Sequence, residues 1–360
     1  MNGDVEKYFD RYVSNTLAGI GNQSFFDSCG RKTCYVFYKV FKAGRFGYSF
    51  LFSNVIDSTY ADGTHSVANI ECDGWKIYEL SAFVSNSLKM PRRESAFKTV
   101  TFGGKSEKNV KKGELFYSDE ILLDIPENYY LGLKITFDGK QIPNHPENQI
   151  PCFRDARGEW RATKEVPLPS MVGCVRSVKK RITFWGDSIT QGCGVKENSY
   201  DHYAAVTARL AGNEYAFWDI GIGYARAFDA ASGGIWAYKA KHTDVCIICF
   251  GVNDIGSART PKKILSDLKI IVRRLKDCGV RVVVQTIPPF EFNEKGAATQ
   301  REVNKLIFSD LELSECLFDE TVFLTDVKTQ KPIYGGHPNQ TGCAVWGGQL
   351  YKFLKEANIL

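Results

Sequence analysis

The chain has 360 residues, 44% of them hydrophobic and 24% charged, which is typical of a soluble globular protein with two domains or one large domain. Its net charge of +5, from 46 basic and 41 acidic residues, is too small to indicate a nucleic-acid partner. The sequence has neither a run of eighteen apolar residues nor a secretory-type leader, so we expect no membrane partner and a cytoplasmic location.

The first half of the chain consists mainly of short segments with the two-residue alternation of half-buried strands. After a helix within the first 20 residues, we expect strands at 34–41, 48–53, 76–85, 120–125 and 131–138. Gly, Asn, Asp and Pro separate these segments. Many short strands joined by turns predict a β-sandwich, similar to a jelly roll, over residues 1–165. Residues 166–180 contain two prolines and several charges, and we predict that they form a linker.

In the second half, strands and helices alternate. We expect strands at 181–186, 215–222, 244–251 and 280–287, helices near 199–212 and over 260–279, and a final helix after residue 342. This alternation predicts an α/β domain over residues 181–360, with a mostly parallel sheet between two layers of helices.

The eleven cysteines are an odd number, and several lie in apolar runs. We expect Cys174, Cys246 and Cys249 to be buried, reduced thiols. The last two have C-x-x-C spacing, but a strand would point them to opposite faces, so we expect no metal or redox role for them.

Polar or flexible residues follow the expected parallel strands. The strand ends carry Gly186-Asp187-Ser188, then residues 221–226, then 250–256, and residues 334–342 precede the final helix. Carboxyl ends of parallel strands share one edge of a sheet, so these segments are expected to meet there. They supply a hydroxyl, backbone amides, a carboxamide and an imidazole, which are the groups that acyl transfer needs.

Four segments, "GDSITQG", "GIG", "GVND" and "HPNQTG", resemble in order and spacing the four sequence blocks of the SGNH (GDSL-type) hydrolase family. The resemblance covers residues 178–360 and implies a three-layer hydrolase domain without cofactor or metal. It implies Ser188 as nucleophile and His337 as base. It also implies oxyanion donors at the Ser188 amide, at the side chain of Asn253 and at the second-block residue, which is Gly223 or Tyr224 depending on the alignment.

The first half is also similar to the β-domain of two-domain carbohydrate and acyl esterases of this family. The segments "LFSNVIDST" and "FGGKSEKNVKKGELFYSDEILLDI" carry that likeness.

The sequence departs from the family pattern just before the histidine. The family usually has an aspartate three residues upstream, where this chain has Tyr334. Two alternatives follow: Asp326 acts as the third member of a triad, or a backbone carbonyl orients His337 in a Ser–His dyad. We favour the dyad. We further expect Asp187 and Asp254 to be structural.

We also expect His202 to be exposed to solvent, and Gly192 and Gly194 to serve only the turn after Ser188.

The resulting hypothesis is a serine esterase acting on small acyl esters, with O-acetyl groups on carbohydrate as the leading substrate. Its expected partner is an acetylated sugar or oligosaccharide. Two alternatives stay open: a lipase or thioesterase of the same family, and a non-catalytic carbohydrate-binding protein built on a hydrolase scaffold.

Overall fold

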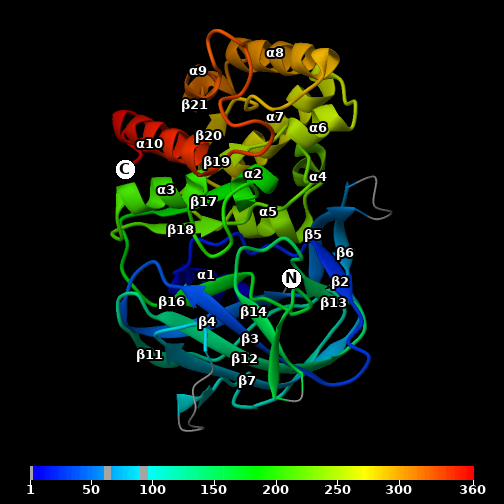
Figure 1. Ribbon diagram of the computed structural model, residues 1–360, viewed down its shortest axis with the longest axis vertical. Helices are drawn as coiled ribbons and strands as arrows, with labels where there is room; N and C mark the ends of the chain where they lie inside the picture. The colour runs from blue at the N-terminus through cyan, green and yellow to red at the C-terminus, as the bar shows by residue number, and fades with distance from the viewer. Residues whose placement is uncertain (1–2, 61–65, 90–95, 157) are drawn as a thin grey trace. The chain divides into compact units, whose positions relative to one another are not determined.

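The computed structural model describes residues 3–60, 66–89, 96–156 and 158–360 (Figure 1). Contacts within the described chain define two compact units. The first comprises Met1–Ile56, Ile70–Ser177 and Ala216–Trp218, and the second comprises Asp57–Asn69, Val178–Tyr215 and Asp219–Leu360. Residues 57–69, which we had placed in the N-terminal domain, therefore group with the second unit.

The first unit is built from antiparallel sheets, as the strand pattern predicted. One five-stranded sheet has the order β1-β16-β4-β10, with β11 also paired to β4. A seven-stranded sheet has the order β15-β14-β3-β12-β7-β8, with β9 also paired to β7, and β13 pairs with β2. The bounds are α1 (Gly3–Arg11), β1 (Val13–Ser14), β2 (Ser24–Phe26), β3 (Lys32–Lys39), β4 (Gly44–Ser53), β7 (Trp75–Ser85), β8 (Lys98–Thr99), β9 (Lys108–Val110), β10 (Leu115–Tyr117), β11 (Ile121–Ile125), β12 (Tyr130–Gly139), β13 (Ile142–Asn144), β14 (Cys152–Ala156), β15 (Glu159–Ala162) and β16 (Met171–Cys174). The predicted strands at 34–41, 48–53, 76–85, 120–125 and 131–138 are thus confirmed.

The predicted linker over residues 166–180 is wrong in its central part. Met171–Cys174 forms β16, which pairs antiparallel with β4 and places Met171 opposite Leu51. All four residues of β16 are buried. The prolines and charges that flank this segment suggested a linker, but its short apolar stretch completes a sheet between β1 and β4.

The α/β region has the predicted organisation around a five-stranded sheet of order β18-β17-β19-β20-β21, and it includes β18, of which Ala216–Trp218 group with the first unit. Strands β17, β19, β20 and β21 pair in parallel. Its elements are β17 (Arg181–Gly186), α2 (Ser188–Gln191), α3 (Tyr203–Ala211), β18 (Ala216–Asp219), α4 (Ala227–Ala231), α5 (Gly234–Ala240), β19 (Val245–Cys249), α6 (Val252–Gly256), α7 (Pro261–Asp277), β20 (Arg281–Gln285), α8 (Glu294–Ser309), η2 (Ser314–Cys316), β21 (Leu317–Phe318), α9 (Thr321–Leu324) and α10 (Gln340–Glu356). Strands β5 (Val55–Tyr60) and β6 (Ser66–Glu71) pair with each other.

Strand β17 shows why helices cover both faces of this sheet. Successive side chains of a strand point to opposite faces. The ring of Phe184 packs edge-on against Tyr203 of α3, whereas Trp185 packs edge-on against Trp236 of α5. On the Phe184 face, α3 and α10 lie side by side (Figure 1), and Tyr203 stacks on Trp346 with ring centroids 4.3 Å apart. The sheet is therefore apolar on both sides, and the three-layer prediction is confirmed.

All eleven cysteines lie in the described part of the chain and are free thiols. Cys246 and Cys249 are buried within β19, and burial raises the pKa of both thiols above the usual range. Within the residues that the structure describes, no helix has the length and apolar character needed to cross a membrane.

A buried ion pair ties β5 to α5 inside the second unit. The ammonium nitrogen of Lys239 lies 2.5 Å from Oδ2 of Asp57, and both side chains are fully buried. A buried charge is tolerated only with a partner, so each of these residues depends on the other.

We expect Lys239→Met to lower the free energy of unfolding by about 3–5 kcal/mol, because it leaves the Asp57 carboxylate buried without its partner. Chemical denaturation measures this loss. The double variant Lys239→Met/Asp57→Leu should recover part of it, and Lys262→Met, at an exposed position of α7, serves as the control. Equal stability of Lys239→Met and the control would contradict the importance of this pair.

Candidate active site

Ser188 is the first residue of α2, directly after β17. Its Oγ lies 2.9 Å from Nε2 of His337, which makes the two side chains a hydrogen-bonded pair at the carboxyl edge of the sheet. Gly186 lets α2 begin this close to the strand. A Cβ there would lie 2.1 Å from Oγ1 of Thr190 and 2.6 Å from the carbonyl oxygen of Cys249. The strand tip therefore holds the hydroxyl in the position that the sequence predicted.

Asp187 has a structural place between the strand and the helix. Its side chain caps α2 by accepting a hydrogen bond of 2.9 Å from the N–H of Ile189. The residue is buried, and burial raises the pKa of its carboxyl group to about 7. Asp187 thus fixes the helix that carries Ser188 without itself facing solvent.

The segment after β18 differs from our expectation at Gly223. The N–H of Gly223 donates to Oε1 of Gln191, at 2.5 Å, and Gln191 is fully buried at the end of α2. This bond connects the segment after β18 to α2. It also occupies the Gly223 N–H, which we expected to donate to the oxyanion. The next residue, Tyr224, has φ of 65° and a side chain that is 41% exposed. A left-handed backbone conformation is unfavourable for a tyrosine, so the surrounding structure must hold Tyr224 in it.

Asn253 lies in α6, after the third strand, and reaches back to the second segment. Its Nδ2 donates to the carbonyl oxygen of Ala225 at 3.0 Å. A carboxamide carries two N–H donors, so this bond leaves one for a ligand. The neighbouring Asp254 is buried and accepts from the N–H of Ala227, at 2.8 Å, at the start of α4. Burial raises the pKa of Asp254 to about 6, and its role is structural, as the sequence suggested.

The segment that carries His337 is held by glycine contacts and by a tyrosine. A Cβ on Gly194 would lie 2.6 Å from the carbonyl oxygen of Pro338 and 3.0 Å from Cβ of His337. Gly194 therefore does more than serve the turn after Ser188, because it lets that turn pack against the histidine segment. Tyr334, in the position of the usual aspartate, donates from its hydroxyl to the carbonyl oxygen of Pro289 at 2.8 Å. Asn339, two residues after His337, caps α10, with its side chain accepting from Gly342 N–H at 3.0 Å.

Asp326 makes bonds within its own turn. Its Oδ1 accepts from the N–H groups of Lys328, at 2.9 Å, and Thr329, at 2.7 Å, and from the Thr329 hydroxyl at 3.0 Å. The hydrogen bonds from Thr329 lower the pKa of Asp326 below its usual value, and the bond from the backbone N–H has the larger effect. The structure thus gives this carboxylate a turn-capping role, and its catalytic role stays a prediction.

A different carboxylate lies beside the residues that precede His337. Oε1 of Glu291 would be 3.3 Å from a Cβ on Gly335, and its Oε2 would be 3.7 Å from a Cβ on Gly336. The glycine pair leaves room for this side chain. Sequence reasoning missed Glu291 because it is remote in the chain and belongs to none of the four blocks.

The prediction that His202 is exposed is wrong. The side chain is buried, and its Nε2 lies 3.1 Å from Oδ2 of Asp219. Asp219 also accepts from the N–H of Gly221 at 2.8 Å, and burial raises the pKa of its carboxyl group. His202 packs against Gly192, whose Cβ would lie 3.0 Å from the Cβ of the histidine. His202 is tolerated in the protein interior because Asp219, at the end of β18, provides a buried polar partner.

Residues 184–344 match the sequence model of a family described as the GDSL-like Lipase/Acylhydrolase family. A search of curated proteins finds no match for the chain. Among solved structures, a member of the lipolytic protein G-D-S-L family from Veillonella parvula is 17% identical, with a TM-score of 0.39, covering 50% of this chain and 99% of its own.

Two further solved structures are titled as carbohydrate esterases. A carbohydrate acetylesterase family member from Sinorhizobium meliloti is 14% identical, with a TM-score of 0.41, covering 50% of this chain and 100% of its own. A carbohydrate esterase family 3 structure from Talaromyces cellulolyticus is 18% identical, with a TM-score of 0.38, covering 49% and 97%.

We expect Asp326→Asn to keep kcat within about threefold of the unmodified protein, because asparagine retains the Oδ1 acceptor of an exposed turn. Initial rates on 4-nitrophenyl acetate measure this. Loss of a triad acid can cost about 10⁴ in turnover, so a drop of that order would make Asp326 the third member and refute the dyad.

Proposed function

We propose that the protein is a serine hydrolase of carboxylic esters, because residues 184–344 match the GDSL-like lipase/acylhydrolase family. The observation that carries this proposal is the 2.9 Å contact between Ser188 Oγ and His337 Nε2. A serine hydroxyl is a weak nucleophile by itself and needs a base within hydrogen-bonding distance. The distance and the position at the carboxyl edge of the sheet satisfy that requirement.

In the proposed mechanism, Nε2 of His337 takes the proton of Ser188 as Oγ attacks the ester carbonyl carbon. The carbonyl oxygen becomes an oxyanion, and the tetrahedral intermediate collapses as His337 returns the proton to the leaving alcohol. Water, deprotonated by His337, then attacks the acyl-serine in the same way and releases the carboxylic acid. The imidazole thus acts first as base and then as acid in each half-reaction.

Three donors are proposed for the oxyanion. The backbone N–H of Ser188 lies in the first turn of α2, where N–H groups have no partner within the helix. Asn253 contributes the second hydrogen of its carboxamide. The third is the backbone N–H of Tyr224 rather than that of Gly223, because Gln191 accepts from Gly223. Donors that are already in position stabilise the transition state without reorganisation.

The substrate proposed is a small acyl ester, with acetyl on a sugar hydroxyl as the leading candidate. Where other chains of the family have a glycine, Tyr224 would add a ring beside the acyl carbon, and a bulky acyl group would meet it. His337 is exposed and Ser188 is half-buried, so a large alcohol is able to approach. A lipase or thioesterase activity and a non-catalytic carbohydrate-binding role are the alternatives that substrate tests must separate.

We expect Ser188→Ala to abolish hydrolysis of 4-nitrophenyl acetate while leaving the thermal unfolding midpoint unchanged, because the hydroxyl contributes little to packing. Ser257→Ala removes an exposed hydroxyl just after α6 and should keep full activity. Undiminished hydrolysis by Ser188→Ala would refute the mechanism.

The dependence of the hydrolysis rate on acyl-chain length and on the leaving group discriminates among the three functions. The proposal expects faster hydrolysis of 4-nitrophenyl acetate than of the palmitate ester or of acetyl-coenzyme A. Preference for either of the latter would favour a lipase or a thioesterase. Sugar binding without hydrolysis of any ester would favour the non-catalytic alternative.

We expect Asn253→Ala to lower kcat by roughly 10²–10³ with a smaller change in KM, as for the loss of one oxyanion donor. Thermal unfolding must be measured alongside, because the Asn253 side chain also bonds to Ala225. A variant that changes KM alone would place Asn253 in ground-state binding of the substrate.

A further inference from the structure

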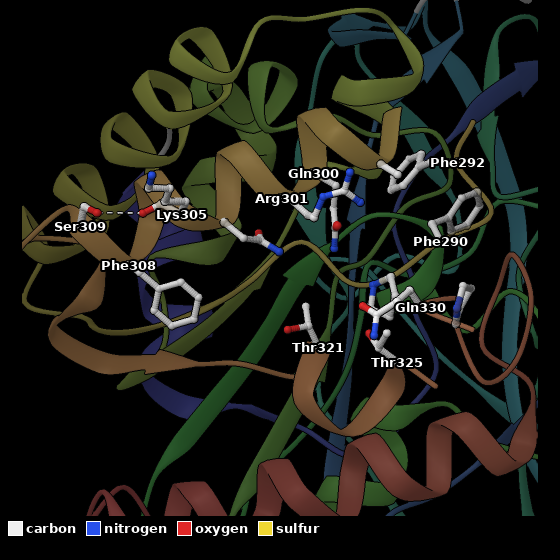
Figure 2. Close-up of a pocket in the computed structure, with 14 residues that line it drawn as sticks. Phe290, Phe292, Gln300, Arg301, Lys305, Phe308, Ser309, Thr321, Thr325 and Gln330 are labelled. Carbon is white, nitrogen blue, oxygen red and sulfur yellow. Dashed lines mark hydrogen bonds between the residues drawn. The ribbon is translucent and has the colours of Figure 1, made fainter. Parts of the chain in front are cut away.

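A groove of about 490 Å³ lies within the second unit, along α8 (Figure 2). One wall is α8 and the opposite wall includes Thr321 and Thr325. The residues that follow β20, among them Pro289 and Phe290, close one end. None of the four family sequence blocks contributes to its lining.

The groove adjoins the proposed base. The ring of Phe290 packs edge-on against the imidazole of His337, with ring centroids 5.5 Å apart and planes at 81°. Pro289 also lines the groove, and its carbonyl oxygen accepts the hydroxyl of Tyr334 from the histidine segment. Phe290 therefore stands between the groove and His337, and a ligand that extends past this ring reaches the imidazole.

The floor of the groove is held in place by amide side chains of α8. Asn304 accepts from the N–H of Ile287 at 2.8 Å and donates to its carbonyl oxygen at 3.0 Å. Gln300 donates to the same carbonyl oxygen at 2.9 Å. These bonds fix α8 to the end of β20, so the groove is formed before any ligand binds, as small-molecule sites commonly are.

Aromatic rings lie at both ends of the groove. Figure 2 shows Phe290 and Phe292 at one end and Phe308 at the other, with Arg301 between them. The rings of Phe290 and Phe292 are 5.4 Å apart, and Phe308 is 50% exposed. Aromatic rings that line a groove offer apolar faces on which the C–H face of a sugar ring can pack.

The charge of the lining is one-sided. It contains Arg301 and Lys305, one helical turn apart on α8, and no aspartate or glutamate. Within the described part of the chain, neither side chain has an ion pair, and the hydroxyl of Ser309 donates to the backbone carbonyl oxygen of Lys305 rather than contacting its ammonium group.

Three basic residues on the adjacent helix α7 differ. Lys269 pairs with Asp310 at 2.5 Å and Arg273 with Glu312 at 2.9 Å, and Lys276 pairs with Glu315. Two cations without an acidic partner, in a lining that also contains aromatic rings, are complementary to an anionic ligand rather than a neutral one.

We propose that this groove is the subsite for the alcohol side of the ester and that it binds an acidic sugar, a carbohydrate unit that carries a carboxylate. This inference rests on the proposed function for the location of the ester. Arg301 and Lys305 pair with the carboxylate, and the phenylalanine rings pack against the sugar. The acyl group then points toward Ser188, because His337 lies between the groove and the serine.

Binding is tested first, on a background in which the ester cannot turn over. Tri-galacturonate is titrated into Ser188→Ala by calorimetry, and into the same variant with Arg301→Ala and Lys305→Ala added. We expect the two additional changes to weaken binding at least tenfold, since each charge-assisted bond contributes that much or more. Lys295→Ala removes a cation from α8 outside the groove lining and should leave binding unchanged.

Specificity is tested next in the active protein. The ratio of kcat/KM for acetylated galacturonate oligosaccharides to that for acetylated neutral xylo-oligosaccharides should fall at least tenfold in Arg301→Ala/Lys305→Ala and stay constant in Lys295→Ala. The change should lie mainly in KM, and higher salt should weaken the preference of the unmodified protein.

The outcomes separate this inference from the proposed function. Tri-galacturonate binding that depends on Arg301 and Lys305, in a protein that hydrolyses no ester, would support the groove and refute the esterase. Hydrolysis with no preference for acidic over neutral substrates, or equal binding by all variants, would overturn the groove. Preference for a sulfated over a uronic oligosaccharide would overturn the carboxylate assignment.

Discussion

The close approach of α2 to the ends of β17 and β19 is the constraint on which the rest of the site depends. Gly186 permits it, since any larger residue would place a Cβ 2.1 Å from Thr190 and 2.6 Å from the Cys249 carbonyl oxygen. Because α2 begins at once, Ser188 projects from the sheet edge while Gln191, one turn later, faces the segment after β18 and bonds Gly223. One tight turn thus positions the hydroxyl and ties a neighbouring strand end to it.

The histidine is brought to the serine by packing rather than by its own secondary structure. It lies between the turn that contains Tyr334 and the capped start of α10. Gly194 allows the segment after α2 to pack directly on Pro338. Tyr334 is bonded to the β20–α8 connection, which also carries Phe290 against the imidazole. In place of the usual aspartate, then, this chain has a tyrosine that anchors the same segment, and that anchor also joins the base to the groove beyond it.

Buried polar pairs fix elements that the apolar core alone would leave adjustable. His202 and Asp219 lie beneath the turn that follows Ser188, and Lys239 and Asp57 join β5 to α5. Apolar packing is tolerant of small shifts, whereas a buried charge without its partner is strongly unfavourable. Such pairs therefore specify a position more narrowly than the surrounding side chains do.

Much of the fold was predictable because the signals are local. The alternation of apolar and polar residues predicted β12. An apolar stripe, with Thr260 before it and Gly279 after it, predicted α7. The alternating order of strands and helices after residue 181 predicted the parallel sheet. The pairing of Ser188 with His337 was predictable for the same reason, since short motifs carry both residues. The β16 strand was mistaken for a linker because four apolar residues are too few to show a period.

The sequence by itself determined the order of strands and helices, the two-part layout and the pair of side chains at the sheet edge. Only the tertiary structure decided the partner of each polar group, because partners come from remote parts of the chain. It buried His202 beside Asp219, occupied the Gly223 amide with Gln191, and left Arg301 without an acid among the described residues. Residue types and spacing encode a group's chemistry, but a hydrogen bond or an ion pair exists only at a distance of a few ångströms, and folding alone sets that distance.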